Sequence, residues 1–225
     1  MDSLLKESIG GFAFLMLILA LALFLPAGSL SFPLAWVYPA VFAACTILIT
    51  AYLVRFDPKL LASRVKGGPM AESRRSQQII QGLAAIFFIG LYVVAGLDFR
   101  FHWSAVPPVV SLMADGFVVL GFVIVFLVFK ENSYTSATIE VSQGQTVIST
   151  GPYRVVRHPM YAGAFLLLIF TPPALGSWVA LPSVVPLILV IVVRLLEEEK
   201  FLVIHLSGYE AYRRKVRFRL VPFIW

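Results

Sequence analysis

The chain has 225 residues, of which 60% are hydrophobic and only 13% are charged. Soluble domains average about 45–50% apolar and about 25% charged residues, so this composition excludes a soluble globule and indicates a membrane protein. The apolar content also excludes a disordered chain. The single cysteine excludes an intramolecular disulfide and a cysteine-based metal site. The formal charge is +6, and the positions of the charges are more informative than their sum.

Hydrophobic segments long enough to cross a membrane, about 20 residues each, recur along the chain. The first uncharged stretch runs from Ser8 to Val54, and Pro26, Gly28 and Pro33 interrupt it near its middle. We therefore predict spans at residues 9–25, 34–54, 78–97 and 108–129, followed by a helical hairpin with arms at 160–175 and 177–196.

Basic residues predict the orientation, because cytoplasmic loops are enriched in Lys and Arg. All but one of the 18 Lys and Arg residues lie in the N-terminal segment, in the loops 55–75 and 130–157, or in the tail from residue 194 onward. Only Arg100 lies in the opposite loops. The sequence thus predicts an all-α integral membrane protein with about six transmembrane helices and both termini in the cytoplasm.

The first candidate functional segment runs from Gln145 to Gly163 and contains the sequence Arg157-His158-Pro159. We expect Pro159 to begin a helix, because proline is favoured in the first turn. A basic residue and a histidine beside a helix N-terminus suit a carboxylate or a phosphate. From the residues alone, the alternative that these charges only flank the membrane and contact lipid headgroups is equally good.

The second candidate segment contains Arg194 and the three consecutive glutamates Glu197, Glu198 and Glu199. Arg194 and Glu198 are four residues apart and share a helix face, where an ion pair is expected. Three adjacent glutamates beside anionic headgroups are unusual and predict a site for a cation. The alternative is a solvated helical turn with a local ion pair.

The tail from Tyr212 to Trp225 interleaves basic and apolar residues. Such a segment suits an anionic membrane surface. Nucleic-acid binders also interleave basic and aromatic residues. Because this tail follows a membrane span, the lipid surface is the more economical partner, and no nucleic acid is expected.

Several other site types are not expected from the sequence. The three histidines, His102, His158 and His205, lie in separate segments without metal-ligand spacing, so no metal site is predicted. The chain lacks a Walker loop and the GxSxG turn of serine hydrolases. Asp115 is the acidic residue placed inside a span, where such residues are often functional, although snorkelling or a local pair explains it equally.

The two candidate segments together resemble a known enzyme family. The sequence from Gly151 to Gly163, the hairpin, the glutamates and the closing Val221-Pro-Phe-Ile resemble the isoprenylcysteine carboxyl methyltransferase family. The wider group includes the membrane phospholipid methyltransferases. The resemblance covers roughly residues 132–225. The hydrophobic spans predict a four-helix transmembrane region at residues 1–129, and the resemblance implies a methyltransferase core at residues 130–225.

The resemblance implies S-adenosylmethionine (SAM) as the methyl donor, bound in a cytosolic pocket, and a lipid-like acceptor that enters from the bilayer. The implied cofactor contacts are Gln145, Thr146, Val147, Ile148, Tyr153, His158, Pro159, Met160, Tyr161 and Glu199. The expected catalytic residues are Arg157, Arg194 and Glu198. Either arginine would orient a carboxylate acceptor through a two-pronged hydrogen bond, and a glutamate is a candidate base for an amine acceptor.

The resemblance implies, as the leading methyl acceptor, the carboxyl group of an isoprenylcysteine-like thioether. The second candidate acceptor is a phospholipid or isoprenoid amine. Two other classes remain open at this point. A sterol-type membrane reductase has a similar hairpin and tail but uses NADPH. A transporter or scaffold is the non-enzymatic alternative, and a transporter should place polar groups along a path through several spans.

Overall fold

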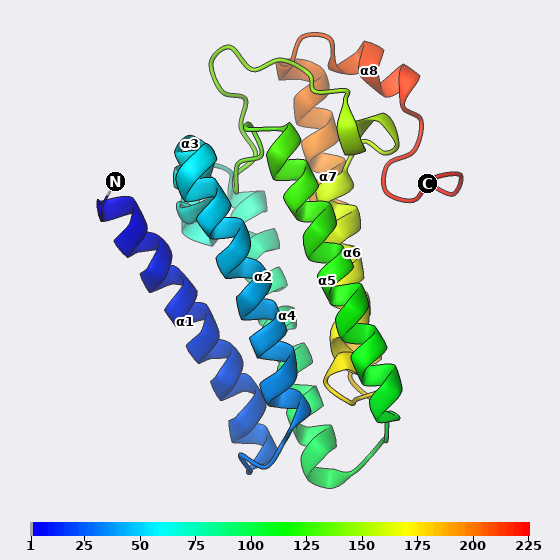
Figure 1. Cartoon of the computed structure of the whole chain (residues 1–225). Helices are drawn as coiled ribbons and strands as arrows, with labels where there is room; N and C mark the ends of the chain where they lie inside the picture. Colours follow the sequence, from blue (N-terminus) through cyan, green and yellow to red (C-terminus); the bar gives the residue numbers. More distant parts are fainter. Residues whose placement is uncertain (1) are drawn as a thin grey trace.

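The computed structural model describes residues 2–225, with side chains from Ser3 onward, and this part of the chain is entirely helices, turns and loops. Four helices are long and apolar enough to cross a membrane: α1 Asp2–Ala27, α2 Leu34–Phe56, α4 Arg75–Phe101 and α5 Pro108–Glu131. A hairpin of α6 (Pro159–Ala174) and α7 (Val184–His205) follows (Figure 1). The short helices are α3 Pro58–Val65, α8 Tyr209–Lys215 and three 3-10 turns, η1 Pro69–Ala71, η2 Gly151–Arg154 and η3 Leu181–Ser183.

The all-α membrane architecture and the first four predicted helices are confirmed, but the hairpin differs from its prediction. Its first arm, α6, has 16 residues, fewer than the roughly 20 that a full crossing needs. Its second arm begins at Val184 rather than at residue 177, because a turn and η3 follow Gly176. This arm continues to His205 rather than ending at residue 196. Glutamate and lysine are good helix formers, so the charges after Leu196 do not end the helix.

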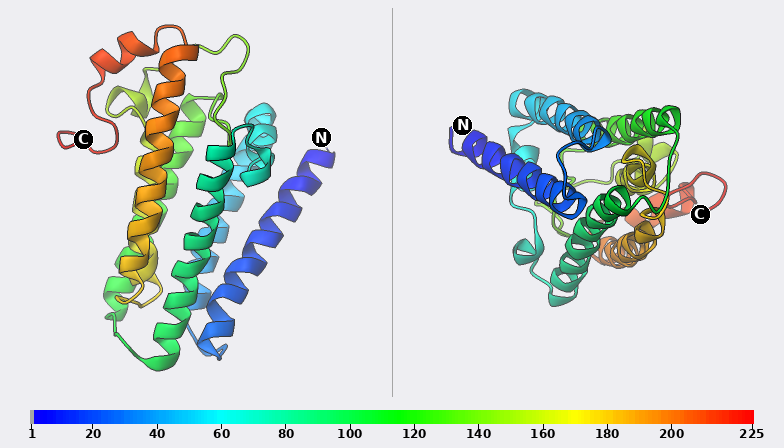
Figure 2. Two further views of the ribbon diagram at one scale, coloured as in Figure 1. Left: turned by 180° about the vertical axis from the view of Figure 1, so that it is seen from behind. Right: turned by 90° about the horizontal axis from the view of Figure 1, so that it is seen from below.

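The tightest packing in the bundle joins α5 to α6. A Cβ added at Gly121 would lie 2.8 Å from the carbonyl oxygen of Gly163, and one added at Gly163 would lie 2.9 Å from that of Gly121. Only glycine lets two helix backbones approach so closely. Figure 2 shows α1 at the edge of the bundle, leaning outward toward its N-terminal end. The first arm of the hairpin, α6, is therefore held mainly by α5, whereas the second arm, α7, packs mainly against α4.

Buried polar contacts fasten the helices to one another. In the core, the hydroxyl of Tyr38 lies 2.8 Å from those of Tyr92 and Thr171, which links α2, α4 and α6. Asp115 is also buried, and its carboxylate has no hydrogen-bond partner among the side chains of residues 3–225. The hydrogen bonds of Tyr38 therefore contribute to the association of three helices in the core.

One end of the bundle gathers most of the irregular structure. The helix α3, the loop between α5 and α6, α8 and the C-terminal segment all lie at this end (Figure 1). The N-terminus lies toward the same end. The two candidate segments identified in the sequence meet here.

Candidate active site

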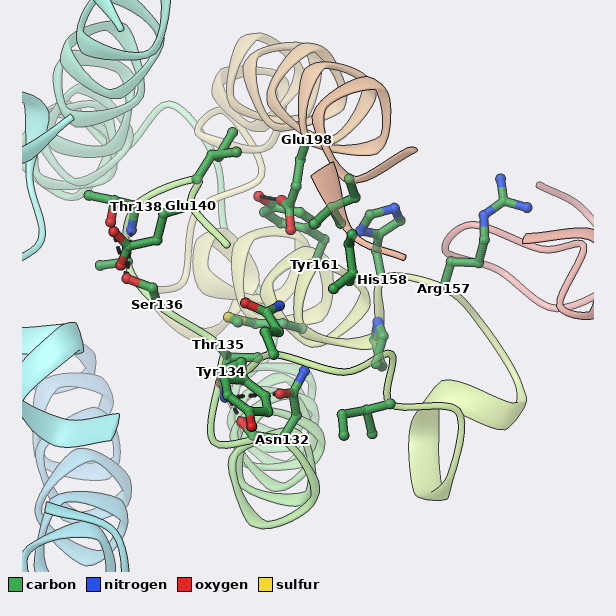
Figure 3. Close-up of a pocket in the computed structure, with 18 of the residues that line it drawn as sticks. Asn132, Tyr134, Thr135, Ser136, Thr138, Glu140, Arg157, His158, Tyr161 and Glu198 are labelled. Carbon is green, nitrogen blue, oxygen red and sulfur yellow. Dashed lines mark hydrogen bonds between the residues drawn. The ribbon is translucent and has the colours of Figure 1, made fainter. Parts of the chain in front are cut away.

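A cavity of about 450 Å³ opens at this end of the bundle. Its volume falls in the range of about 300–1,000 Å³ that is usual for small-molecule sites. The walls come from the loop 132–148, the start of α6, the C-terminal half of α7 and the segment that follows it (Figure 3). The lining includes every predicted site residue except Glu199: Gln145, Thr146, Val147, Ile148, Tyr153, Arg157, His158, Pro159, Met160, Tyr161, Arg194 and Glu198.

The C-terminal segment holds the Arg157-His158-Pro159 sequence in place. The backbone N–H of Arg157 donates to the carbonyl oxygen of Phe218 at 2.9 Å, and that of His158 donates to Arg219 at 2.9 Å. These two bonds run between extended backbones. The residues around 218 are therefore fastened to the segment that lines the cavity.

The helix α6 begins at Pro159, as predicted, and its first turn faces the cavity. The first hydrogen bond of the helix runs from the N–H of Ala162 to the carbonyl oxygen of His158 at 3.1 Å. Helix geometry leaves the N–H groups of Met160 and Tyr161 without intrahelical partners. These N–H groups make the turn suitable for an anionic group.

The carboxylate of Glu199 lies behind the cavity and is engaged by two arginines and a histidine. It accepts from Arg157 Nε at 2.6 Å and Arg219 Nε at 2.9 Å, and His158 Nε2 lies 3.3 Å away. Burial by itself would raise the pKa of Glu199, but hydrogen bonds with His158, Arg219 and Arg157 lower this pKa to about 2. Because Glu199 does not line the cavity, its position does not support the expected contact between Glu199 and the cofactor.

The guanidinium of Arg157 forms its hydrogen bonds through Nε and Nη1 to groups within the protein. Besides Glu199, it donates through Nη1 to the carbonyl oxygens of Val216 and Arg217, each at 3.0 Å. Figure 3 shows the Arg157 side chain directed away from the cluster of Glu198, Tyr161 and His158. The expectation that Arg157 orients the acceptor is therefore not supported by its position, and its contacts hold the C-terminal segment.

Glu198 is the member of the triple glutamate that reaches the cavity. Tyr161 donates a hydrogen bond of 2.6 Å from its hydroxyl to Glu198 Oε2, and both residues line the cavity. Adjacent residues of a helix point about 100° apart, which explains why Glu198 and Glu199 face different surroundings. The structure thus brings a carboxylate and a phenol together next to His158.

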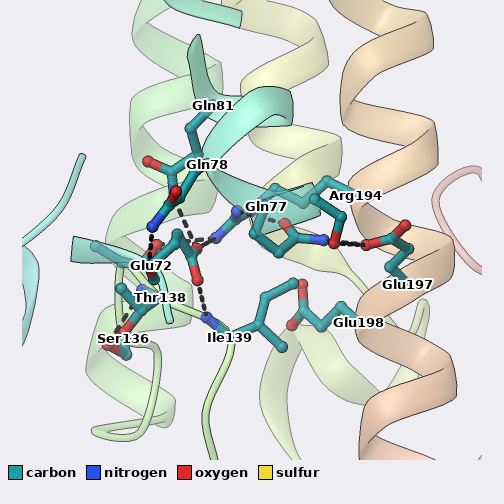
Figure 4. Close-up of polar contacts among 12 residues, drawn as sticks. Glu72, Gln77, Gln78, Gln81, Ser136, Thr138, Ile139, Arg194, Glu197 and Glu198 are labelled. Carbon is teal, nitrogen blue, oxygen red and sulfur yellow. Dashed lines mark hydrogen bonds and ion pairs between the residues drawn. The ribbon is translucent and has the colours of Figure 1, made fainter. Parts of the chain in front are cut away.

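Arg194 does not pair with Glu198, so the predicted local ion pair is wrong. Its Nη2 instead lies 2.9 Å from Glu72 Oε1 and donates to the carbonyl of Ala137 at 2.9 Å, while Nη1 donates to Gln77 Oε1 at 2.8 Å (Figure 4). Gln77 in turn donates to Glu197. The helical spacing could not reveal these partners, because Glu72 and Gln77 come from a distant segment of the chain.

Comparison with known proteins agrees with this site. Residues 109–207 match the phospholipid methyltransferase family. Over this region, which is less than half of the chain, the sequence is similar to the membrane phospholipid methyltransferases. The matched region begins in α5 and includes the loop, the Arg157-His158-Pro159 sequence, the hairpin and the glutamates. The match supports the resemblance inferred from these motifs over the part of the chain that carries them.

The chain also resembles a curated relative. The methanethiol S-methyltransferase of Crocosphaera subtropica is 32% identical to it over 126 residues, which are 56% of this chain and 45% of the relative. The chain thus spans less than half the length of that relative.

Three polar residues that shape the site lie outside residues 109–207 and were missed in the sequence. Glu72 and Gln77 hold Arg194, and Arg64 of α3 lines the cavity directly. In the sequence, Arg64 counted only as one of the basic residues of a cytoplasmic loop. No local pattern distinguishes it from its neighbours Lys59 and Lys66, because its role depends on the fold.

Proposed function

We propose that the chain is a SAM-dependent methyltransferase whose acceptor reaches the cavity from the bilayer. The observation that carries the proposal is the cavity itself, which unites the first turn of α6 with Glu198 of α7 at one end of a membrane bundle. The family match and the activity named for the relative support methyl transfer. Nothing in the cavity resembles a phosphate-binding loop for NADPH, so the reductase is the weaker alternative.

The residues of the cavity fit the charges of SAM. Glu198 is an acidic partner for the ammonium group. The free N–H groups at the start of α6 suit the carboxylate. The rings of Tyr153 and Tyr161 offer faces for the adenine or the sulfonium, since an aromatic face attracts a cation. When bound, SAM supplies a methyl group on a positively charged sulfur, and transfer of this group leaves neutral S-adenosylhomocysteine.

The leading acceptor is the carboxylate of an isoprenylcysteine-like thioether. Apolar residues of the hairpin, Ala164 and Ile191, line the part of the cavity nearest the bundle, where a prenyl chain would lie. A carboxylate oxygen is already nucleophilic and requires no base. The contribution of the protein is then to position the two substrates and to exclude water.

A thiol is the second candidate acceptor, and the name of the relative favours it. A thiol must lose its proton before or during attack on the methyl group. Glu198, with Tyr161 hydrogen-bonded to it, is the candidate base, because the pair lies in the cavity wall. A thiol acceptor thus requires Glu198 as a base, whereas a carboxylate acceptor does not.

A direct assay tests the proposal. The purified protein in detergent is incubated with methyl-labelled SAM and, in separate reactions, with a farnesylated cysteine, a small thiol, a phospholipid amine and no acceptor. Methylation of one acceptor class is expected, together with calorimetric binding of SAM. Binding of NADPH in place of SAM would reject the proposal. With SAM at a concentration that saturates the variant, Glu198→Gln should abolish transfer to a thiol but leave measurable transfer to a carboxylate.

We also propose that the cavity faces the cytoplasm, with both termini on that side and residues 1–129 serving as anchor and wall. The basic residues of the loops support this orientation. The measurement is labelling of single cysteines, introduced at Lys66 and Trp103 in a Cys45→Ser background, with an impermeant maleimide in intact cells. Labelling at Lys66 but not at Trp103 would reverse the proposed orientation.

A further inference from the structure

Most charged side chains that surround the cavity have a partner inside the protein. Arg157 is paired with Glu199, Arg194 is paired with Glu72, and Glu198 accepts a hydrogen bond from Tyr161. Arg64 is a cation that faces the cavity without an ion pair, and Glu140, which also lines the cavity, likewise forms none among the side chains of residues 3–225.

The surroundings of Arg64 fix its guanidinium without neutralising it. Nη1 donates to the carbonyl of Ser136 at 3.2 Å and points to the sulfur of Met160 at 3.8 Å. The guanidinium lies over the ring of Phe129, with its carbon 5.2 Å from the ring centre. Nε and Nη2 have no hydrogen bond within the described residues. A guanidinium carries five N–H donors, so most of its capacity is left for a ligand.

The charge of Arg64 is poorly compensated at this position. Burial is the main cause that lowers the pKa of Arg64, and the positive charge of Arg194 acts in the same direction. A cation that is partly withdrawn from water without a counter-charge is costly, and an anion bound in the cavity would relieve that cost.

The cavity has two ends, and Arg64 belongs to the one nearest the bundle. Its neighbours there are the first turn of α6 and the apolar residues Ala164 and Ile191. The opposite end is formed by residues 145–148 and by Tyr209 and Tyr212. Arg64 therefore lies on the side of the cavity where an apolar chain would be accommodated, whereas the carboxylate of SAM has the N–H groups of α6.

We infer that Arg64 binds an anionic group of the methyl acceptor and so selects acceptors that carry a negative charge beside the reacting atom. The inference rests on the proposed function. A carboxylate matches the free Nε and Nη2 donors best, because a guanidinium presents two parallel N–H groups at carboxylate spacing. Since Arg64 precedes the matched residues 109–207, this selectivity is a property of the N-terminal part of the chain.

The test compares matched acceptor analogues that differ only in charge. Binding of 3-(farnesylthio)propionate and its amide, and of 3-mercaptopropionate and its amide, is measured to protein saturated with S-adenosylhomocysteine. The variant is Arg64→Gln, and the control is Arg55→Gln, an exposed arginine one helix earlier that does not line the cavity. The affinity for SAM is measured separately on each protein.

In the unmodified chain, at least one carboxylate should bind about tenfold to a hundredfold more tightly than its amide, as expected for a charge-assisted pair. Arg64→Gln should remove this preference, Arg55→Gln should retain it, and the affinity for SAM should stay within about twofold. The inference is overturned if neither carboxylate is preferred, or if the preference survives in Arg64→Gln. A tenfold loss of SAM affinity in Arg64→Gln would also overturn it, since the bound anion would then belong to the donor. Failure of the unmodified chain to bind SAM at all would instead count against the proposed function.

Discussion

Replacing Arg157 by alanine is expected to destabilise the protein more than it impairs the chemistry of methyl transfer. The side chain supplies one ion pair and two hydrogen bonds to carbonyl groups, and all three fasten α7 and the C-terminal segment to the loop before α6. The substitution leaves Glu199 buried with one partner fewer. Arg219 and His158 remain beside it and limit the loss.

The size of the effect follows from the burial of the pair. Removing one partner of a buried ion pair costs about 3–5 kcal/mol. The two remaining partners of Glu199 place the expected loss at the low end, about 3 kcal/mol. For a chain of this length a loss of 1 kcal/mol lowers the melting temperature by about 2–4 °C, so a decrease of about 6–12 °C is expected.

The assay is thermal unfolding in detergent, followed by intrinsic tryptophan fluorescence, with methyl transfer measured at a temperature well below both transitions. The double variant Arg157→Ala/Glu199→Gln should be less destabilised than the sum of the single variants, because the uncompensated carboxylate has been removed. An unchanged melting temperature with a large loss of turnover would refute this reasoning and return Arg157 to the acceptor site.

Three further outcomes are expected. Because the pKa of Glu199 is about 2 when folded and 4.5 in the reference state, its pairs stabilise the protein by about 3 kcal/mol above pH 4.5, and this contribution is lost as the pH falls toward 2. The difference in melting temperature between the unmodified chain and Glu199→Gln should therefore shrink between pH 6 and pH 3, and a constant difference would contradict it. Gly163→Ala should lower stability by about 1–3 kcal/mol through overpacking against Gly121, whereas Gly82→Ala, which meets open space, should not lower it. Glu198→Gln should weaken SAM binding at least tenfold in calorimetry with little change in melting temperature, and unaltered affinity would remove Glu198 from the donor site.

The sequence was sufficient for the helices but not for the choice of partners. Long uncharged stretches predict the first four helices well, because hydropathy and helix length are local properties. The meeting of the Arg157 segment with the glutamates also follows from the hairpin. By contrast, the sequence does not show which glutamate faces the cavity, because Glu198 and Glu199 are adjacent in α7 and point in different directions. The partners of Glu199 come from both sides of the hairpin, before α6 and after α7.

The partner of Arg194 also could not be predicted from the local sequence. Helical spacing favours Glu198 as its partner, and the fold supplies Glu72 from the loop before α4 instead. A buried carboxylate from a distant segment outcompetes a neighbour on the same helix when it offers better geometry in a less hydrated place. Arg64 enters the cavity for a comparable reason, since the position of α3 depends on its packing against α1 and α2.

The contact between Gly121 and Gly163 restricts how the bundle can move. Where two backbones touch, no side chain is present that can change rotamer, so α5 and α6 are expected to shift together as one rigid pair. The contact between α6 and α7 is far less extensive. A bulky hydrocarbon chain that has to widen the bundle on its way in would therefore separate α7 from α6, and substitutions along that seam should change the rate of entry before they change the chemistry.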